Sequence, residues 1–219
     1  MELRLKLRAR ATSDYDTAFR ARSDEIFDLI DEAIQKPWNG FEITRSAPET
    51  IKNTAFQRVD MRLTYKGRSW GTVKVELAPV EGKMGDEADL IEADALDGLQ
   101  VPIPERVRCM SLRYQVAQKI HACTEVFDEP PENDRFRDIM GLLLLEDLIR
   151  DTGLSRVREA CVEIFEAREK HSWPPSVTVY ESWPEPYRIL SEENGFSPSD
   201  IHEAARQLQD LIDEINAAS

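Results

Sequence analysis

The alternation of apolar and polar positions divides the chain into a first half that favours strands and a second half that favours helices. Residues 3–7 alternate with a period of two, and residues 13–20 continue in an extended pattern. Further strands are predicted at 41–46, 55–66 and 69–80. The sequence Lys66-Gly67-Arg68 between the last two is typical of a β-hairpin.

One helix interrupts these strands, at residues 23–36. Ser23 is a suitable N-cap, acidic residues fill the first turn, and an apolar stripe repeats at helical spacing. That stripe consists of Ile26, Phe27, Ile30, Ala33 and Ile34. Helical periodicity then dominates from residue 111 onward, at 111–127, 135–150, 154–170 and 197–219. Residues 172–187, rich in proline and aromatic residues, indicate no regular element.

These elements predict an α+β protein, with a mixed N-terminal sheet and covering helices followed by a helical region. The change in composition predicts a domain at residues 1–100 and a helical domain at 101–219. Three widely spaced cysteines, Cys109, Cys123 and Cys161, favour reduced thiols in the cytoplasm over a disulfide framework or zinc site. No apolar run approaches the ~20 residues of a membrane span, and no secretory signal is recognisable.

The net charge of −14 argues against a general nucleic-acid coat protein. The charge is uneven, however. Residues 1–22 hold six basic side chains against Glu2, Asp14 and Asp16. Such a segment can guide a polyanion to one place on an acidic body, or it can simply be solvated.

Asp14 and Asp16 are the strongest candidates for chemistry. In a strand they lie on one face about 6–7 Å apart. Two carboxylates this close repel each other unless a cation lies between them, and Mg²⁺ suits such oxygen ligands. Glu76, on the polar side of the strand at 69–80, is the candidate third acid, and Asp60 competes for that role. Alternatively, the two early aspartates are ordinary surface residues.

The order of four short segments adds weight to these candidates. The sequence contains RATSDYD at 10–16, VELA at 75–78, AQKIHA at 117–122 and RFRDIMGLLLL at 135–145. Over residues 3–145 it resembles the AbiEii/AbiGii-type nucleotidyltransferase toxins of bacterial abortive-infection and toxin–antitoxin systems. These toxins belong to the DNA-polymerase-β-like nucleotidyltransferase superfamily, so the resemblance implies a nucleotidyltransferase-like sheet in the first domain.

The resemblance also implies roles for individual residues. Asp14, Asp16 and Glu76 are the implied metal ligands and, with Asp138 of the helical half, the catalytic acids. Lys119 is implied to contact nucleotide phosphates, and Arg10 to lie beside the triphosphate or the acceptor. The implied cofactor is Mg²⁺ or Mn²⁺. Without the resemblance, Lys119 can be an edge residue of its helix, and Asp138 can pair with Arg135 or Arg137.

The implied reaction moves a nucleoside monophosphate from an NTP to an acceptor hydroxyl, with the 3′ end of tRNA as the expected acceptor. A small molecule or protein hydroxyl is a looser option. The implied partners are an NTP, tRNA and a cognate antitoxin protein, in the cytoplasm and without a membrane. The alternative is a catalytically impaired protein of this fold that acts through protein binding.

The sequence departs from the family pattern in three places, and the first and last of these favour that alternative. No Gly-Gly or Gly-Ser pair precedes Asp14, so either the natural start lies upstream or the phosphate-binding turn is lost. Gln118 replaces the glutamate before the lysine, and Gly141 replaces the second aspartate of the helical motif. His121, beside Lys119, is a candidate base, although a helix-packed histidine is the favoured interpretation.

Overall fold

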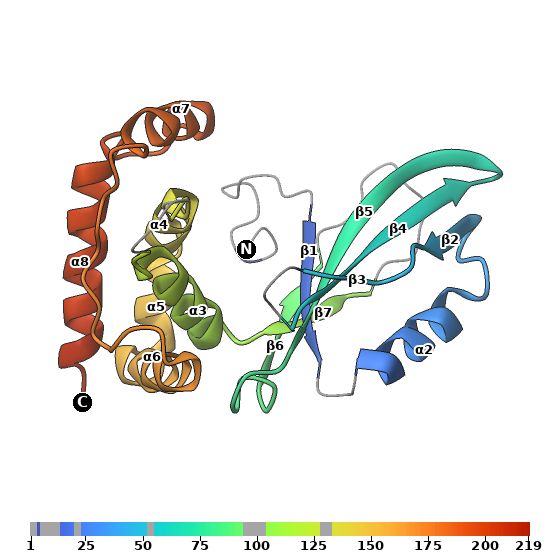
Figure 1. The fold of residues 1–219 in the computed structure, drawn as a ribbon, viewed down its shortest axis with the longest axis horizontal. Coiled ribbons are helices and arrows are strands. Elements are labelled where there is room, and N and C mark those ends of the chain that lie inside the picture. The colour runs from blue at the N-terminus through green and yellow to red at the C-terminus, as the bar shows by residue number, and fades with distance from the viewer. Residues whose placement is uncertain (1–3, 5–13, 20–22, 52–54, 94–103, 128–132) are drawn as a thin grey trace. The chain divides into compact units, whose positions relative to one another are not determined.

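The computed structural model describes residue 4 and residues 14–19, 23–51, 55–93, 104–127 and 133–219, with only the backbone of residues 14–19 and 23–24. The chain divides into two compact units. The sheet unit comprises Ala11–Asp86 and Ala93–Arg106. The helical unit comprises the segments Glu87–Glu92 and Val107–Ser219, together with Arg4. Figure 1 shows the elements of each unit.

The sheet unit is built on one mixed sheet with the strand order β1-β5-β4-β2, and the short β3 also pairs with β4. The bounds of these strands are β1 Asp14–Phe19, β2 Phe41–Arg45, β3 Glu49–Thr50, β4 Gln57–Tyr65 and β5 Arg68–Pro79. β1 runs parallel to β5, and the remaining pairs are antiparallel. The first strand of the sequence therefore lies at an edge of the sheet, beside the last strand of the hairpin.

The predicted hairpin is confirmed, and its turn explains its position. β4 and β5 are joined by Lys66 and Gly67, which both have positive φ, at 49° and 75°. A two-residue turn with both central residues in this region matches the twist of the flanking strands. Gly67 adopts this conformation without steric cost. The two long strands that leave the turn, β4 and β5, form the centre of the sheet (Figure 1).

Helix α2, Ser23–Ile34, covers one face of this sheet and confirms the predicted helix. Phe27 of the helix packs against Val59 of β4 and Leu77 of β5. Asp31 binds Arg45 of β2 through two hydrogen bonds of 2.6 Å, and this arginine lowers the pKa of Asp31. The packing assigns the apolar positions of β4 and β5 to the helix-covered face, so the alternate positions form a polar face.

The helical unit contains six described helices and a two-stranded sheet. Its helices are α3 Leu112–Thr124, α4 Phe136–Leu144, α5 Glu146–Thr152, α6 Leu154–Arg168, α7 Pro184–Asn194 and α8 Ile201–Ala217. Their core includes Val116, Ile139, Ile164 and Leu208, all fully buried. β6 Ala88–Glu92 pairs with β7 Arg106–Met110. The Asp89 carboxylate accepts the backbone N–H of Leu112 and so caps the start of α3.

Several sequence-based expectations need correction. The helix expected at 135–150 is two helices that meet at Leu145, where the backbone N–H bonds to the carbonyl of Leu142 and a new helix begins with Glu146 and Asp147. Helix α7 begins within residues 172–187, for which the sequence predicted no regular element. The strands β3, β6 and β7 were also missed. The strand expected at 3–7 lies outside the described residues except Arg4, which is helical. Among the described helices, none has the length and apolar character needed to cross a membrane.

Candidate active site

The register of β1 on β5 brings the predicted acidic positions of the sheet unit together. Asp14 pairs with Lys74, and Asp16 pairs directly with Glu76. Paired positions on neighbouring strands belong to the same face of a sheet. Asp14, Asp16 and Glu76 are therefore positions of the polar face, opposite α2. The grouping of these three positions on adjacent strands follows from the backbone alone.

Asp60, the competing candidate, occupies a different place. It lies on β4, where it pairs with Lys74, and Lys74 in turn pairs with Asp14. Asp60 is thus two strands from β1, or roughly 10 Å at the usual strand spacing, whereas Glu76 is one strand away. Its backbone N–H donates to the Ser46 hydroxyl at 3.0 Å. The topology therefore favours Glu76 as the third acid.

Glu76 is engaged by Arg58, a residue that the sequence analysis did not single out. Both Nε and Nη2 of Arg58 donate to Glu76 Oε1, and the Nε–Oε1 distance is 2.9 Å. Arg58 and Glu76 face each other across β4 and β5, and both side chains are half-buried. The pair places the Arg58 guanidinium beside the Glu76 carboxylate on the polar face of the sheet.

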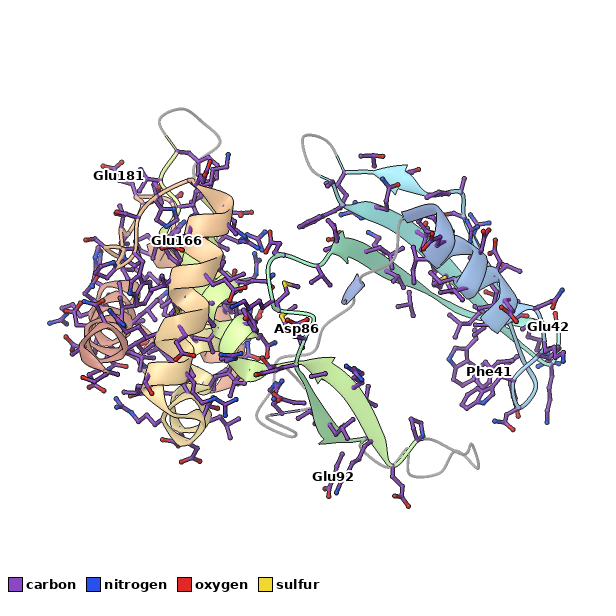
Figure 2. All side chains as sticks on the ribbon, turned by 90° about the horizontal axis from the view of Figure 1, so that it is seen from below. Phe41, Glu42, Asp86, Glu92, Glu166 and Glu181 are labelled. Carbon is purple, nitrogen blue, oxygen red and sulfur yellow. The ribbon has the colours of Figure 1, made fainter. Side chains whose placement is uncertain are left out.

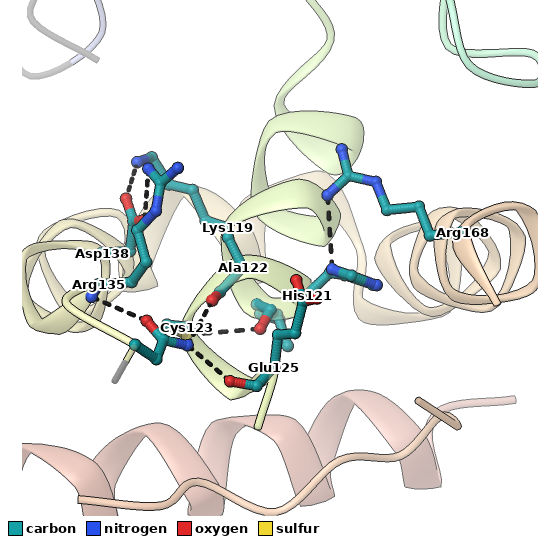
Figure 3. A network of polar contacts seen from close by, with 10 residues as sticks. Lys119, His121, Ala122, Cys123, Glu125, Arg135, Asp138 and Arg168 are labelled. Atoms are coloured by element: carbon teal, nitrogen blue, oxygen red, sulfur yellow. Dashed lines mark hydrogen bonds and ion pairs between the residues drawn. The ribbon is translucent and has the colours of Figure 1, made fainter. Parts of the chain in front are cut away.

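In the helical unit, Lys119 and Asp138 form an ion pair between α3 and α4. Figure 3 shows Arg135 beside Lys119 at the same carboxylate, with Arg135 Nη1 3.7 Å from Asp138 Oδ2. The Asp138 side chain is only 12% exposed. Two cations thus share one largely buried carboxylate: Arg135, as in the alternative interpretation of Asp138, and Lys119.

Asn133 fixes the geometry of this pair, and the sequence analysis missed it. Its side-chain amide donates to the carbonyls of Ala122 and Glu125, both at 2.8 Å, while its Oδ1 accepts the backbone N–H of Arg135 at 2.9 Å (Figure 3). One buried side chain thereby joins the end of α3 to the start of α4. The signal was available, since asparagine just before a helix commonly bonds to the backbone two residues on.

His121 is a core residue in the structure. It is 1% exposed and packs against Phe165 and His171, with ring-centroid distances of 4.9 and 4.5 Å. Burial and the nearby Arg168 lower the pKa of His121 to about 3. The imidazole is therefore neutral at physiological pH, and the interpretation as a packed histidine accounts for its surroundings better than a role as a base.

The buried imidazole predicts a pH-dependent stability. Because His121 titrates near pH 3 when folded and near 6.5 when unfolded, the unfolded chain binds more protons between these values, and stability falls as the pH falls. From pH 6.5 to pH 5 this histidine should cost about 2 kcal/mol.

Urea unfolding at pH 5 and pH 7 should show that His121→Phe loses about 2 kcal/mol less than the wild type. Cys161→Ala, at another buried position, should lower stability equally at both pH values, and an undiminished acid loss in His121→Phe would contradict the assignment.

The remaining sequence-based candidates are Arg10, the metal site and Gly141. Arg10 lies outside the described residues. Among the side chains that the structure describes, no three His, Cys, Asp or Glu lie close enough to hold a metal ion, and this set does not include the side chains of Asp14 and Asp16. Gly141 is buried within α4, next to Met140 and Leu142 of the core.

The fold and the sequence both define a class of protein. The structure is similar to MenT4, a nucleotidyltransferase toxin from Mycobacterium tuberculosis H37Rv, with a TM-score of 0.55 and 17% sequence identity, covering 99% of this chain and 72% of that chain. The chain therefore has a fold similar to that of MenT4.

The family follows from the sequence. The family described as "Nucleotidyl transferase AbiEii toxin, Type IV TA system" matches residues 1–217. The chain belongs to this family of nucleotidyltransferase toxins, which are components of type IV toxin–antitoxin systems. A comparison with proteins of curated function gives no match.

Proposed function

We propose that this toxin is a metal-dependent nucleotidyltransferase that transfers a nucleoside monophosphate from an NTP to the 3′-terminal hydroxyl of tRNA. The observation that carries the proposal is the register of β1 on β5, in which Asp16 pairs with Glu76. Asp14 lies two residues before Asp16 on β1 and therefore belongs to the same face of the sheet. Three carboxylates at neighbouring positions of one face favour a bound cation, which would add to the charges of Arg58 and Lys74 on the same face.

The donor set fits a hard divalent cation. Asp14, Asp16 and Glu76 would supply carboxylate oxygens, which Mg²⁺ and Mn²⁺ favour, from two adjacent strands. When bound, such a cation neutralises phosphate charge and lowers the pKa of an attacking hydroxyl. The Arg58 guanidinium already forms an ion pair with Glu76. Glu76 would therefore contribute to cation binding less strongly than the two aspartates.

The proposed step exchanges one phosphorus–oxygen bond for another. The acceptor oxygen bonds to the α-phosphorus, the bond from that phosphorus to the β-phosphate bridging oxygen breaks, and pyrophosphate leaves. The hydroxyl proton passes to a carboxylate of the acidic group or to water. Lys119 and Arg10 are the proposed phosphate-binding cations, because a lysine ammonium acts as a compact point charge and arginine forms paired hydrogen bonds. Asp138 is the proposed acid that holds Lys119, through the ion pair described above.

The proposed acceptor and partners follow from the family rather than from the geometry. A toxin of a type IV system is expected to have a cognate antitoxin, and blocking the acceptor end of tRNA would arrest translation. NTPs and tRNA occur together in the cytoplasm, where we place the protein. The basic side chains of residues 1–22 would help to hold RNA on a chain whose net charge is otherwise −14.

The direct test combines the purified protein with Mg²⁺, each labelled NTP in turn and total tRNA. Label should enter the tRNA with the wild type, should require the divalent cation, and should be lost with Asp14→Ala. Equal labelling by the wild type and Asp14→Ala would reject the assignment. Absence of labelling, together with antitoxin binding that Asp14→Ala does not alter, would instead favour a catalytically impaired protein that acts through protein contacts.

A further inference from the structure

Four aromatic side chains gather at the end of the sheet that holds the β4–β5 turn. Phe41 lies 4.8 Å from Tyr65 and 5.5 Å from Trp70 between ring centroids, and Trp38 lies 6.3 Å from Phe41. Figure 2 shows Phe41 and neighbouring rings at this end of the sheet unit. We call this group the aromatic tip, defined as Trp38, Phe41, Tyr65 and Trp70. Such edge-to-face and tilted pairs hold rings in fixed orientations.

The outer rings of the aromatic tip remain in solvent. Phe41 is buried and anchors the group, whereas Trp38 is 47% exposed and Trp70 is 56% exposed. The turn is held in place beneath them, since the Lys66 N–H donates to the carbonyl of Gly40 at 3.0 Å. The tip therefore presents two large flat side chains on a rigid support.

Cations lie beside the aromatic tip, although the chain as a whole is acidic. The Lys66 ammonium lies 5.1 Å from the centroid of the Tyr65 ring. Arg68 pairs with Tyr65 across the hairpin, and Lys36 precedes Trp38 by two residues. The acid next to Phe41, Glu42, alternates to the other face of β2. Lys66 and Arg68 thus place two cations at the tip of a chain of net charge −14, and two cations are complementary to an anionic partner.

We infer that the aromatic tip is a docking surface for unpaired nucleotides of an RNA, with bases stacked on Trp38 and Trp70 and phosphates facing Lys66 and Arg68. Flat rings beside cations are the combination that binds single-stranded nucleic acid, since every base offers a face for stacking. Trp70 lies six residues before Glu76 on β5, or roughly 20 Å along the strand. Tyr65 follows Val59 by six residues on β4, so the tip belongs to the α2-covered face, and an RNA that uses both places passes around an edge of the sheet. The inference deepens the proposed function, and it rests on that function for the identity of the RNA.

Binding without catalysis provides the test. Total tRNA and a labelled single-stranded oligoribonucleotide are titrated with the protein in fluorescence anisotropy, without NTP or divalent cation. Trp70→Ala should raise the Kd for RNA about tenfold, because one stacking contact contributes about 1–3 kcal/mol. Leu29→Ala is the matched control, since Leu29 of α2 is also 56% exposed and belongs to the same unit but not to the tip. Its Kd should equal that of the wild type.

The cations are tested by the salt dependence of the same titration. Lys66→Gln and Arg68→Gln should each reduce the slope of log affinity against log salt by about 0.7, the value for one phosphate contact with a single strand. An unchanged Kd in Trp70→Ala, or slopes unchanged in both charge variants, would overturn the inference. It would also be overturned if Trp70→Ala dissociated a homodimer, or lost the antitoxin, while RNA affinity stayed at the wild-type value.

The outcome is separable from that of the proposed function. If the wild type binds RNA through the tip but never labels it, the proposed transfer fails and the docking surface stands. If labelling occurs and Trp70→Ala leaves both the Kd and the KM for tRNA unchanged, the docking surface fails and the transfer stands.

Discussion

Replacing Asp14 with asparagine is expected to lower the rate of nucleotide transfer about 10³-fold, or about 4 kcal/mol of transition-state stabilisation. Asparagine keeps the shape of the side chain and removes the charge that would hold the cation against the phosphates. Asp16→Asn should have a similar effect, because Asp16 pairs directly with Glu76 on β5. Steady-state transfer of labelled nucleotide to tRNA measures both variants.

The controls use acids elsewhere in the sheet unit. Asp28→Asn changes an exposed aspartate on α2, which covers the opposite face of the sheet, and should leave transfer unchanged. Glu76→Gln should reduce transfer by less than the Asp14 variant, because Arg58 already shares the charge of Glu76. Asp60→Asn should reduce it least of the variants on the polar face. Transfer by Asp14→Asn within tenfold of the wild type would remove Asp14 from the cation site.

Replacing Trp183 with alanine is expected to destabilise the helical unit by about 3–5 kcal/mol. Trp183 is 1% exposed, and its ring lies near those of Phe136 and Tyr180. Its indole N–H donates to the carbonyl of Asn133, the residue that joins α3 to α4. The substitution therefore removes a large apolar side chain and leaves a buried carbonyl without its donor. Urea unfolding followed by helical circular dichroism measures the loss.

Trp70→Ala is the matched control for this change, because the chemistry is identical and the site is largely exposed. It should cost about 1 kcal/mol, from lost ring contacts with Phe41 and Tyr65. The two tryptophans are thus expected to separate stability from RNA binding. A Trp183→Ala variant that unfolds at the same urea concentration as Trp70→Ala would show that Asn133 and its neighbours are not held by this ring.

The sequence predicted the elements whose signals are local. The stripe of Ile26, Phe27 and Ile30 marked α2, and Lys66-Gly67 marked the hairpin, since each depends on residues close together in the chain. The break at Leu145 escaped prediction because the apolar run continues through it. Helix α7 escaped because it begins at Pro184 within an aromatic segment, although proline suits a first helical turn.

The candidate site was predictable only in part, because sheet order is a non-local property. Period-two alternation placed Asp14, Asp16 and Glu76 on polar faces, but it did not determine that β1 lies beside β5 rather than β4. The ion pair of Arg58 with Glu76 depends on the antiparallel register of β4 and β5, which strand patterns alone leave open. The partnership of Lys119 with Asp138 likewise depends on how α3 packs on α4.

The most direct measurement is a crystal structure of the protein with Mn²⁺ and a non-hydrolysable NTP analogue, with the metal located by its anomalous scattering. We predict an anomalous peak bonded to the carboxylates of Asp14 and Asp16 and to phosphate oxygens of the analogue. A peak bonded to other side chains, with both aspartates free of metal and nucleotide, would contradict the assignment of the polar face as the catalytic centre.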